Sequence, residues 1–164
     1  MRITSHGDRD AKLPERAETA RPATVLLVED DSELRSLIAA VLRRDRFDVE
    51  VVEDGSAALE RLGSTLFGDE RANAPDLLIT DFRMPRFDGF DLIEALRLTR
   101  VRTPIILITA FGDAATHARA RELGVAAVLD KPFDLQDLLS LVRGATEARR
   151  GAGPAVGREG SCPG

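Results

Sequence analysis

Three groups of residues in this chain could do chemistry together if the fold brings them to one place. Glu29, Asp30 and Asp31 follow one short apolar run, and a fourth acid, Asp81, follows another. Carboxylates held close together repel one another and retain protons unless a cation offsets their charge. Mg²⁺ suits such a site, because it prefers carboxylate, carbonyl and phosphate oxygens. Lys131, one of only 2 lysines among 23 basic residues, supplies a compact countercharge.

Asp81 is the candidate nucleophile, because enzyme carboxylates form acyl phosphates. Lys131 would offset the charge of a phosphoryl group, and the Thr109 hydroxyl could donate a hydrogen bond to one of its oxygens. Taken alone, the acids at 29–31 are better explained as a helix N-terminus, where the helix dipole favours negative charge. Asp81 and Lys131 also follow short apolar runs, as the acids at 29–31 do, and this favours the chemical interpretation.

Five short apolar runs are predicted strands, and longer amphipathic segments separate them. The predicted strands are residues 24–28, 49–52, 77–80, 105–109 and 126–129. Four are nearly continuous in apolar residues, as in strands covered by helices on both faces, whereas Glu50 indicates that the second is an edge strand. The helix expected over 113–123 is rich in alanine, which predicts the loosest docking of the five helices.

This alternation predicts an α/β fold with a doubly wound parallel sheet, in which ligands bind at the carboxyl ends of the strands. We expect a flexible leader at 1–22, one domain at 23–147 and a flexible Gly/Pro-rich tail at 148–164. The stretch 63–74 is long for a loop, and the sequence assigns it no role.

Bulk properties restrict the functional class. No apolar run approaches the ~20 residues that cross a bilayer, and the charged N-terminus lacks a secretory signal, so a cytoplasmic protein is expected. The single cysteine, Cys162, excludes a disulfide framework within the chain. The net charge of −5 disfavours non-specific binding to nucleic acid.

Four segments resemble the receiver domain of bacterial two-component response regulators, of the single-domain type. They are VLLVEDDSELR, LLITDFRMPRFDGF, PIILITA and VLDKPF, and they occur in the order and spacing of the family. The Asp-x-x-Met-Pro-x-x-Asp-Gly stretch is far more specific than an acidic cluster. The resemblance covers about residues 23–147 and implies a (βα)5 fold, with five parallel strands in the flavodoxin-like order 2-1-3-4-5.

The resemblance also implies a role for each matching residue. Asp81 matches the phosphoacceptor, and Glu29 and Asp30 match the acidic pair that holds Mg²⁺. Asp31 stands at a position that the family does not use for metal. The remaining matches are the metal-binding backbone carbonyl of Arg83, the hydroxyl of Thr109 that moves toward the phosphoryl group, and Lys131, whose bond to Pro132 is cis in receivers.

Two features depart from the family or vary within it. Receivers usually carry Tyr or Phe three residues before the lysine, where this chain has Val128, so we expect switching to depend on the Thr109 loop and the 113–123 helix. Arg83 and Phe111 flank the expected phosphoryl site. Because water must reach an acyl phosphate to hydrolyse it, these two side chains predict a comparatively long-lived phosphorylated form.

The sequence therefore predicts a stand-alone receiver that is phosphorylated by a sensor histidine kinase and catalyses only its own phosphorylation and dephosphorylation. Its expected output is an unknown downstream protein or onward phosphotransfer, without direct DNA or membrane binding, and a homodimer is compatible with the sequence. A receiver-like binding module that no longer needs phosphorylation is the alternative, supported by Val128. An aspartyl-phosphate phosphatase is disfavoured, because Arg83 replaces the second Asp of those enzymes.

Overall fold

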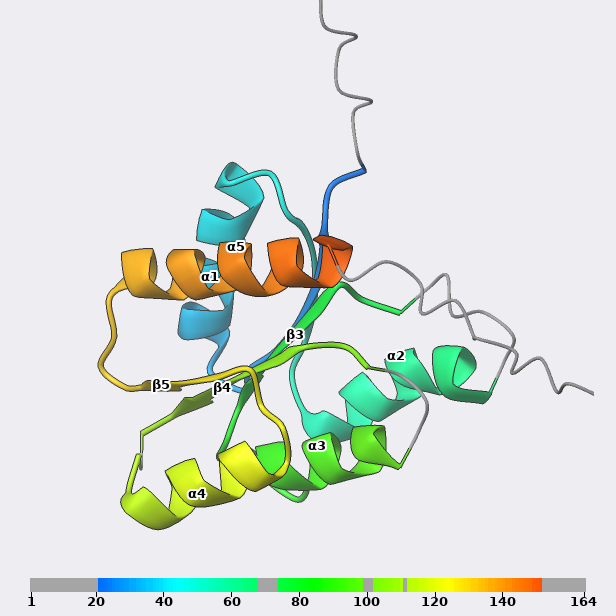
Figure 1. Ribbon diagram of the computed structural model, residues 1–164, viewed down its shortest axis with the longest axis vertical. Coiled ribbons are helices and arrows are strands. Elements are labelled where there is room, and N and C mark those ends of the chain that lie inside the picture. The colour runs from blue at the N-terminus through cyan, green and yellow to red at the C-terminus, as the bar shows by residue number, and fades with distance from the viewer. Residues whose placement is uncertain (1–20, 68–73, 99–101, 111, 152–164) are drawn as a thin grey trace, which may run out of the picture.

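The computed structural model describes residues 21–67, 74–98, 102–110 and 112–151 as a single layered α/β unit (Figure 1). Strands and helices alternate strictly along the chain. They are β1 (Thr24–Val28), α1 (Ser32–Arg44), β2 (Asp48–Val52), α2 (Gly55–Phe67), β3 (Leu77–Asp81), α3 (Gly89–Arg97), β4 (Ile105–Thr109), α4 (Ala114–Glu122), β5 (Ala127–Asp130) and α5 (Leu135–Gly151). Each observed strand lies within one residue of its predicted bounds.

The five strands are parallel and lie in the order β2-β1-β3-β4-β5, which confirms the predicted fold class. β2 is an edge strand, as Glu50 indicated, and Glu50 forms an ion pair of 2.7 Å with Arg61 of α2. In this order, β1 and β3 are neighbours, and their carboxyl ends flank the point where the strand order reverses. Sheets of this type bind ligands at that point.

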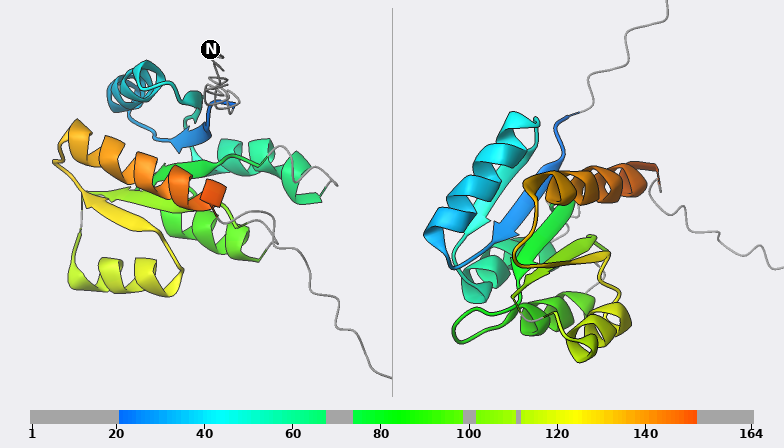
Figure 2. Two further views of the ribbon diagram at one scale, coloured as in Figure 1. Left: turned by 45° about the horizontal axis from the view of Figure 1, so that its top comes forward. Right: turned by 90° about the vertical axis from the view of Figure 1, so that its left-hand side faces the viewer.

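The apolar core has two halves, one on each face of the sheet. Successive strand residues alternate between them: Leu77 and Ile79 join the half under α1 and α5, whereas Leu78 joins the half under α2, α3 and α4. Both views in Figure 2 show the same division of the helices. Coverage of both faces explains why the central strands are continuously apolar.

α4 buries less than the other helices of its face, as its composition predicted. Only Thr116 and Ala120 are buried on it, whereas α3, of equal length, buries Gly89, Leu92, Ile93 and Leu96. Two side-chain contacts add to its attachment: Arg119 pairs with Glu94 of α3, and His117 contacts Asp130 of β5. Exposed pairs of this kind contribute little to stability.

Two helices continue beyond the bounds expected from the sequence. α2 continues to Phe67, so the first residues of the supposed 63–74 loop are helical, while 68–73 lie outside the described residues. α5 continues to Gly151, past the predicted domain end at 147. The reason is Arg149, which donates a 2.9 Å hydrogen bond to Thr103 Oγ1 and pairs with the Asp76 carboxylate at 3.6 Å. Nearly all of the predicted leader and most of the predicted tail lie outside the described residues.

Candidate functional site

The turn after β1 presents two acids and uses the third to begin a helix. Glu29 is completely buried, whereas Asp30 is exposed. Asp31 is the N-cap of α1, where its carboxylate accepts hydrogen bonds from the backbone N–H groups of Glu33 at 2.9 Å and Leu34 at 3.0 Å. These bonds hold the pKa of Asp31 below its ordinary value. Asp31 is therefore a capping residue, in agreement with its exclusion from the expected metal ligands.

A second side chain, which the sequence did not single out, fixes this turn. Arg35 of α1 donates hydrogen bonds from Nη1 to the backbone carbonyl of Glu29 at 2.6 Å and to that of Asp30 at 3.3 Å. Neither the spacing nor the type of Arg35 marked it, because its role depends on how α1 packs back over the turn. The guanidinium thus holds the backbone that carries two carboxylates.

The turn after β3 brings Asp81 against these acids. Glu29, Asp30 and Asp81 each offer a carboxylate oxygen, and the three oxygens lie within 4.8 Å of one another. Burial raises the pKa of Glu29 to about 7, and the neighbouring Asp81 adds to that rise. Burial also raises the pKa of Asp81. The negative charge of the three carboxylates is therefore not fully offset by their surroundings. A divalent cation bound between them would offset it.

Lys131 reaches the same cluster from the loop after β5. Its Nζ lies 3.3 Å from Asp81 Oδ2 and donates a 3.2 Å hydrogen bond to Glu29 Oε2. Burial opposes the charge on Lys131, but the carboxylates of Asp81 and Glu29 outweigh that effect and raise its pKa. The lysine is therefore a fixed cation beside the candidate nucleophile. Its bond to Pro132 is cis, as the resemblance implied.

Thr109 lies at the end of β4, next to the strand that carries Asp81. Its side chain is fully buried, and the backbone N–H of Lys131 donates a 2.7 Å hydrogen bond to its carbonyl. In the register between β3 and β4, Asp81 pairs with Ile108, so Thr109 is one residue beyond Asp81 along the rim. Arg83 follows Asp81 in an exposed position, and Phe111 lies outside the described residues.

The segment after Asp81 is shaped by close packing. Asp88 forms a capping box with Asp91 at the start of α3, as expected for a cap. The residue with a left-handed backbone in this turn is Arg86, with φ of 70°. Glycine is required because a Cβ at position 89 would lie 2.5 Å from the backbone oxygen of Asp81.

His117 has an acidic partner that no sequence pattern indicated. His117 Nε2 lies 3.1 Å from both carboxylate oxygens of Asp130, the residue before Lys131. The same carboxylate fills the space beside Gly112, where a Cβ would lie 1.8 Å from Asp130 Oδ1. The contact joins α4 to the strand end that presents Lys131.

Val128 is half-buried and packs against the core half under α4.

Among the described residues, no helix has both the length and the apolar character needed to cross a membrane. That the whole chain lacks a membrane anchor stays a prediction.

Comparison with known proteins places this geometry in one family. Residues 25–143 match the model of the response regulator receiver domain. The chain is 38% identical over 119 residues to the transcriptional regulatory protein CpxR of Escherichia coli, an alignment that covers 73% of this chain and 47% of that protein. It is 35% identical over 127 residues to the transcriptional regulatory protein PdtaR of Mycobacterium tuberculosis, covering 77% and 58%. The chain thus spans about half the length of these curated relatives.

Solved structures agree with the sequence relatives. The chemotaxis protein CheY4 of Vibrio cholerae is 27% identical with a TM-score of 0.66, and the match covers 76% of this chain and 98% of that one. A response regulator receiver domain protein from Clostridium thermocellum is 26% identical with a TM-score of 0.68, covering 79% and 98%.

Proposed function

Because this chain belongs to the response regulator receiver family, we propose that Asp81 accepts a phosphoryl group from a sensor histidine kinase in a Mg²⁺-dependent reaction. One observation carries the proposal: the Asp81 carboxylate lies within reach of two further acids and 3.3 Å from the Lys131 ammonium. Beyond its own phosphorylation and dephosphorylation we assign the chain no reaction.

The donor set of the acidic cluster fits Mg²⁺. Its ligands would be the carboxylates of Glu29, Asp30 and Asp81, with the backbone carbonyl of Arg83 as a further oxygen. When bound, the ion would supply the charge neutralisation that phosphoryl oxygens need beside three carboxylates. The raised pKa of Glu29 supports this fit, because protonation is how the metal-free cluster limits its own negative charge.

The chain's own residues have separate tasks in the transfer. The donor is a phosphorylated histidine of the kinase. A carboxylate oxygen of Asp81 attacks its phosphorus, the bond from phosphorus to the histidine nitrogen breaks, and the freed imidazole takes up a proton. Lys131, already beside Asp81 Oδ2, offsets the charge of the phosphoryl oxygens. Thr109, on the neighbouring strand, would donate a hydrogen bond to one of those oxygens after its loop moves.

The signal would pass from Thr109 to α4. No aromatic side chain stands at position 128 to couple the two, so movement of the β4–α4 loop must act on α4 directly. α4 suits this task because it buries little and is held partly by the His117–Asp130 contact next to Lys131.

Incubation of the protein with acetyl phosphate and Mg²⁺ tests the proposal by intact mass. We expect an adduct of about 80 Da, the mass of one phosphoryl group, on the unaltered protein and none on Asp81→Asn. Asp48→Asn is the matched control, because Asp48 is exposed at the opposite end of the sheet. An adduct of equal yield on Asp81→Asn would refute the assignment. No adduct on any form would favour the phosphorylation-independent binding module.

Several finer expectations stay proposals. The net charge of −5 supports a protein partner rather than direct DNA binding as the output of this domain. The stand-alone character, the cytoplasmic location and a homodimer stay predictions, and so does shielding of the acyl phosphate by Arg83 and Phe111.

A further inference from the structure

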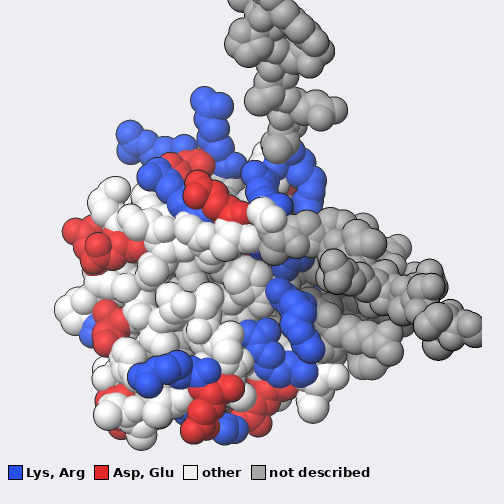
Figure 3. All heavy atoms as spheres, viewed as in Figure 1, with Lys and Arg blue, Asp and Glu red and all other residues white. Residues whose placement is uncertain are grey.

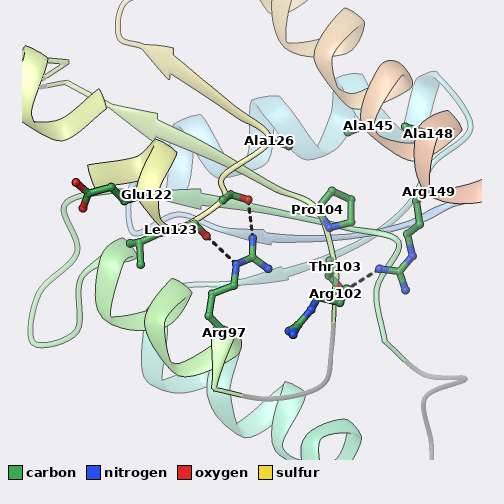
Figure 4. Close-up of a pocket in the computed structure, with 11 residues that line it drawn as sticks. Arg97, Arg102, Thr103, Pro104, Glu122, Leu123, Ala126, Ala145, Ala148 and Arg149 are labelled. Atoms are coloured by element: carbon green, nitrogen blue, oxygen red, sulfur yellow. Dashed lines mark hydrogen bonds between the residues drawn. The ribbon is translucent and has the colours of Figure 1, made fainter. Parts of the chain in front are cut away.

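A hollow of about 720 Å³ opens at the end of the sheet opposite to Asp81 (Figure 4). Thr103 and Pro104 precede β4, Ala126 precedes β5, and the other sides are formed by the C-terminal ends of α3, α4 and α5. Because the strands are parallel, the amino ends of β4 and β5 lie beside this hollow, whereas the carboxyl ends of the strands lie on the side of the acidic cluster. The hollow is therefore a separate site from the proposed phosphoryl site.

The apolar part of the described lining consists mostly of small side chains. Pro104 and Ala126 line the hollow beside β4 and β5, Leu123 lines it from the end of α4, and Ala145 and Ala148 line it from α5. Two alanines one turn apart on α5 leave space that larger side chains would fill. The volume falls within the range of clefts that bind small organic molecules.

The rim of the hollow is basic. Arg97, Arg102 and Arg149 line it, and the space-filling view shows basic side chains gathered between the ends of α5 and α3 (Figure 3). Arg97 Nε donates to the carbonyl of Leu123 at 2.8 Å, and its Nη2 donates to that of Gly124 at 2.9 Å. These bonds hold the guanidinium of Arg97 in place at the hollow (Figure 4).

Burial and neighbouring charges lower the pKa of two of these arginines. Burial lowers the pKa of Arg97, and the positive charge of Arg102 lowers it further. Burial likewise lowers the pKa of Arg149, where Asp76 raises it and Arg21 lowers it. For Arg149 the attraction of Asp76 outweighs the repulsion of Arg21, so the repulsion between positive charges at the hollow is that between Arg97 and Arg102.

Only one of the described lining residues is an acid. Glu122 lies at the edge of the hollow away from Arg149, and its carboxylate already pairs with Arg119 at 3.3 Å. The described lining therefore carries three guanidiniums against one carboxylate, beside its apolar part. This combination is complementary to a ligand with an anionic head and an apolar body.

We propose that the hollow binds a small amphipathic anion, with its carboxylate or phosphate head at Arg97 and Arg102 and its apolar body over Ala126, Ala145 and Ala148. Guanidinium groups suit this head, because they donate paired hydrogen bonds to planar and tetrahedral oxyanions alike. The inference does not rest on phosphorylation of Asp81, so either can fail alone.

NMR titration of the full chain, without Mg²⁺, tests the proposal and identifies the head group. The probes are octanoate, adenosine monophosphate and inorganic phosphate. We expect octanoate or the nucleotide to shift the amide signals of Gly124 and Ala126 saturably, with inorganic phosphate at least about tenfold weaker because it lacks the apolar body. Equal affinity for inorganic phosphate, or shifts centred on the Asp81 loop, would overturn the proposal.

Two variants and their matched controls locate the site. Arg102→Gln removes a rim charge and Ala148→Leu fills space beside the apolar part of the lining, and each should weaken binding by about tenfold or more. Arg44→Gln and Ala40→Leu make the same changes at exposed positions on α1 and should leave binding unchanged. Unchanged affinity in both site variants would overturn the proposal.

Discussion

Glu29 is the residue at which a proton and a metal ion compete most directly. It is completely buried, its pKa is raised to about 7, and its oxygen lies within 4.8 Å of those of Asp30 and Asp81. The folded protein therefore holds this proton more tightly than the unfolded chain does. In the metal-free protein the resulting stabilisation is full below about 4.5, the ordinary pKa, and is lost as the pH rises through about 7.

Mg²⁺ affinity should consequently rise with pH up to about 7 and then level off, because the ion must displace the proton on Glu29. Titration of the protein with Mg²⁺ by calorimetry across this pH range measures the effect. Glu29→Gln should bind more weakly and with a flatter pH profile. Affinity that falls with increasing pH would contradict this account of the cluster.

At the scale of elements, the loop after β3 and the start of α3 are packed directly against β3, the strand that carries the proposed phosphoacceptor. The backbone N–H of Gly89 donates a 2.8 Å hydrogen bond to the carbonyl of Phe82, and the aromatic rings of Phe82 and Phe90 lie 4.8 Å apart. A side chain at position 89 would press on the backbone of Asp81 itself. The position of α3 and the position of Asp81 are therefore linked.

Gly89→Ala should destabilise the fold by about 1–3 kcal/mol, because the added Cβ meets backbone rather than a movable side chain. It should also slow phosphorylation by displacing Asp81. Urea unfolding monitored by circular dichroism gives the first quantity. Gly144→Ala, in α5 with open space around its Cβ, is the control and should stabilise by about 0.5–1 kcal/mol. Equal stability of the two variants would show that the contact at position 89 is not limiting.

α4 and α3 form a natural pair for testing local stability, because both contain 9 residues. α4 buries two residues and α3 buries four, so opening α4 exposes less apolar surface. Amide hydrogen exchange should therefore be faster in α4 than in α3. Equal protection would contradict the view that α4 is the element free to respond to Thr109.

At the scale of the whole molecule, the sequence predicted what depends on local pattern and chain topology. Strands 77–80 and 105–109 were recognisable because burial on both faces demands continuous apolar residues. Asp81 and Lys131 were recognisable because parallel strands deliver their ends to one rim. The strand order then brought these residues together, as the Lys131–Asp81 distance of 3.3 Å illustrates.

What the sequence missed depends on side chains that meet across the fold. The Asp76 carboxylate accepts a 2.9 Å hydrogen bond from the backbone N–H of Thr24 and pairs with Arg149, which fixes the end of α5 beyond the predicted boundary. The pairing of His117 with Asp130 likewise requires α4 to lie beside β5. No periodicity or spacing encodes either contact, because each arises from the packing of whole elements.

The central claim is that one Mg²⁺-dependent pocket directs phosphorylation to Asp81. The most direct test is tandem mass spectrometry of the protein treated with acetyl phosphate, with and without EDTA, to locate the phosphoryl group. The account predicts modification of Asp81 in the presence of Mg²⁺ and its loss when EDTA removes the ion. Modification at another residue, or modification of Asp81 at the same rate with EDTA, would contradict it.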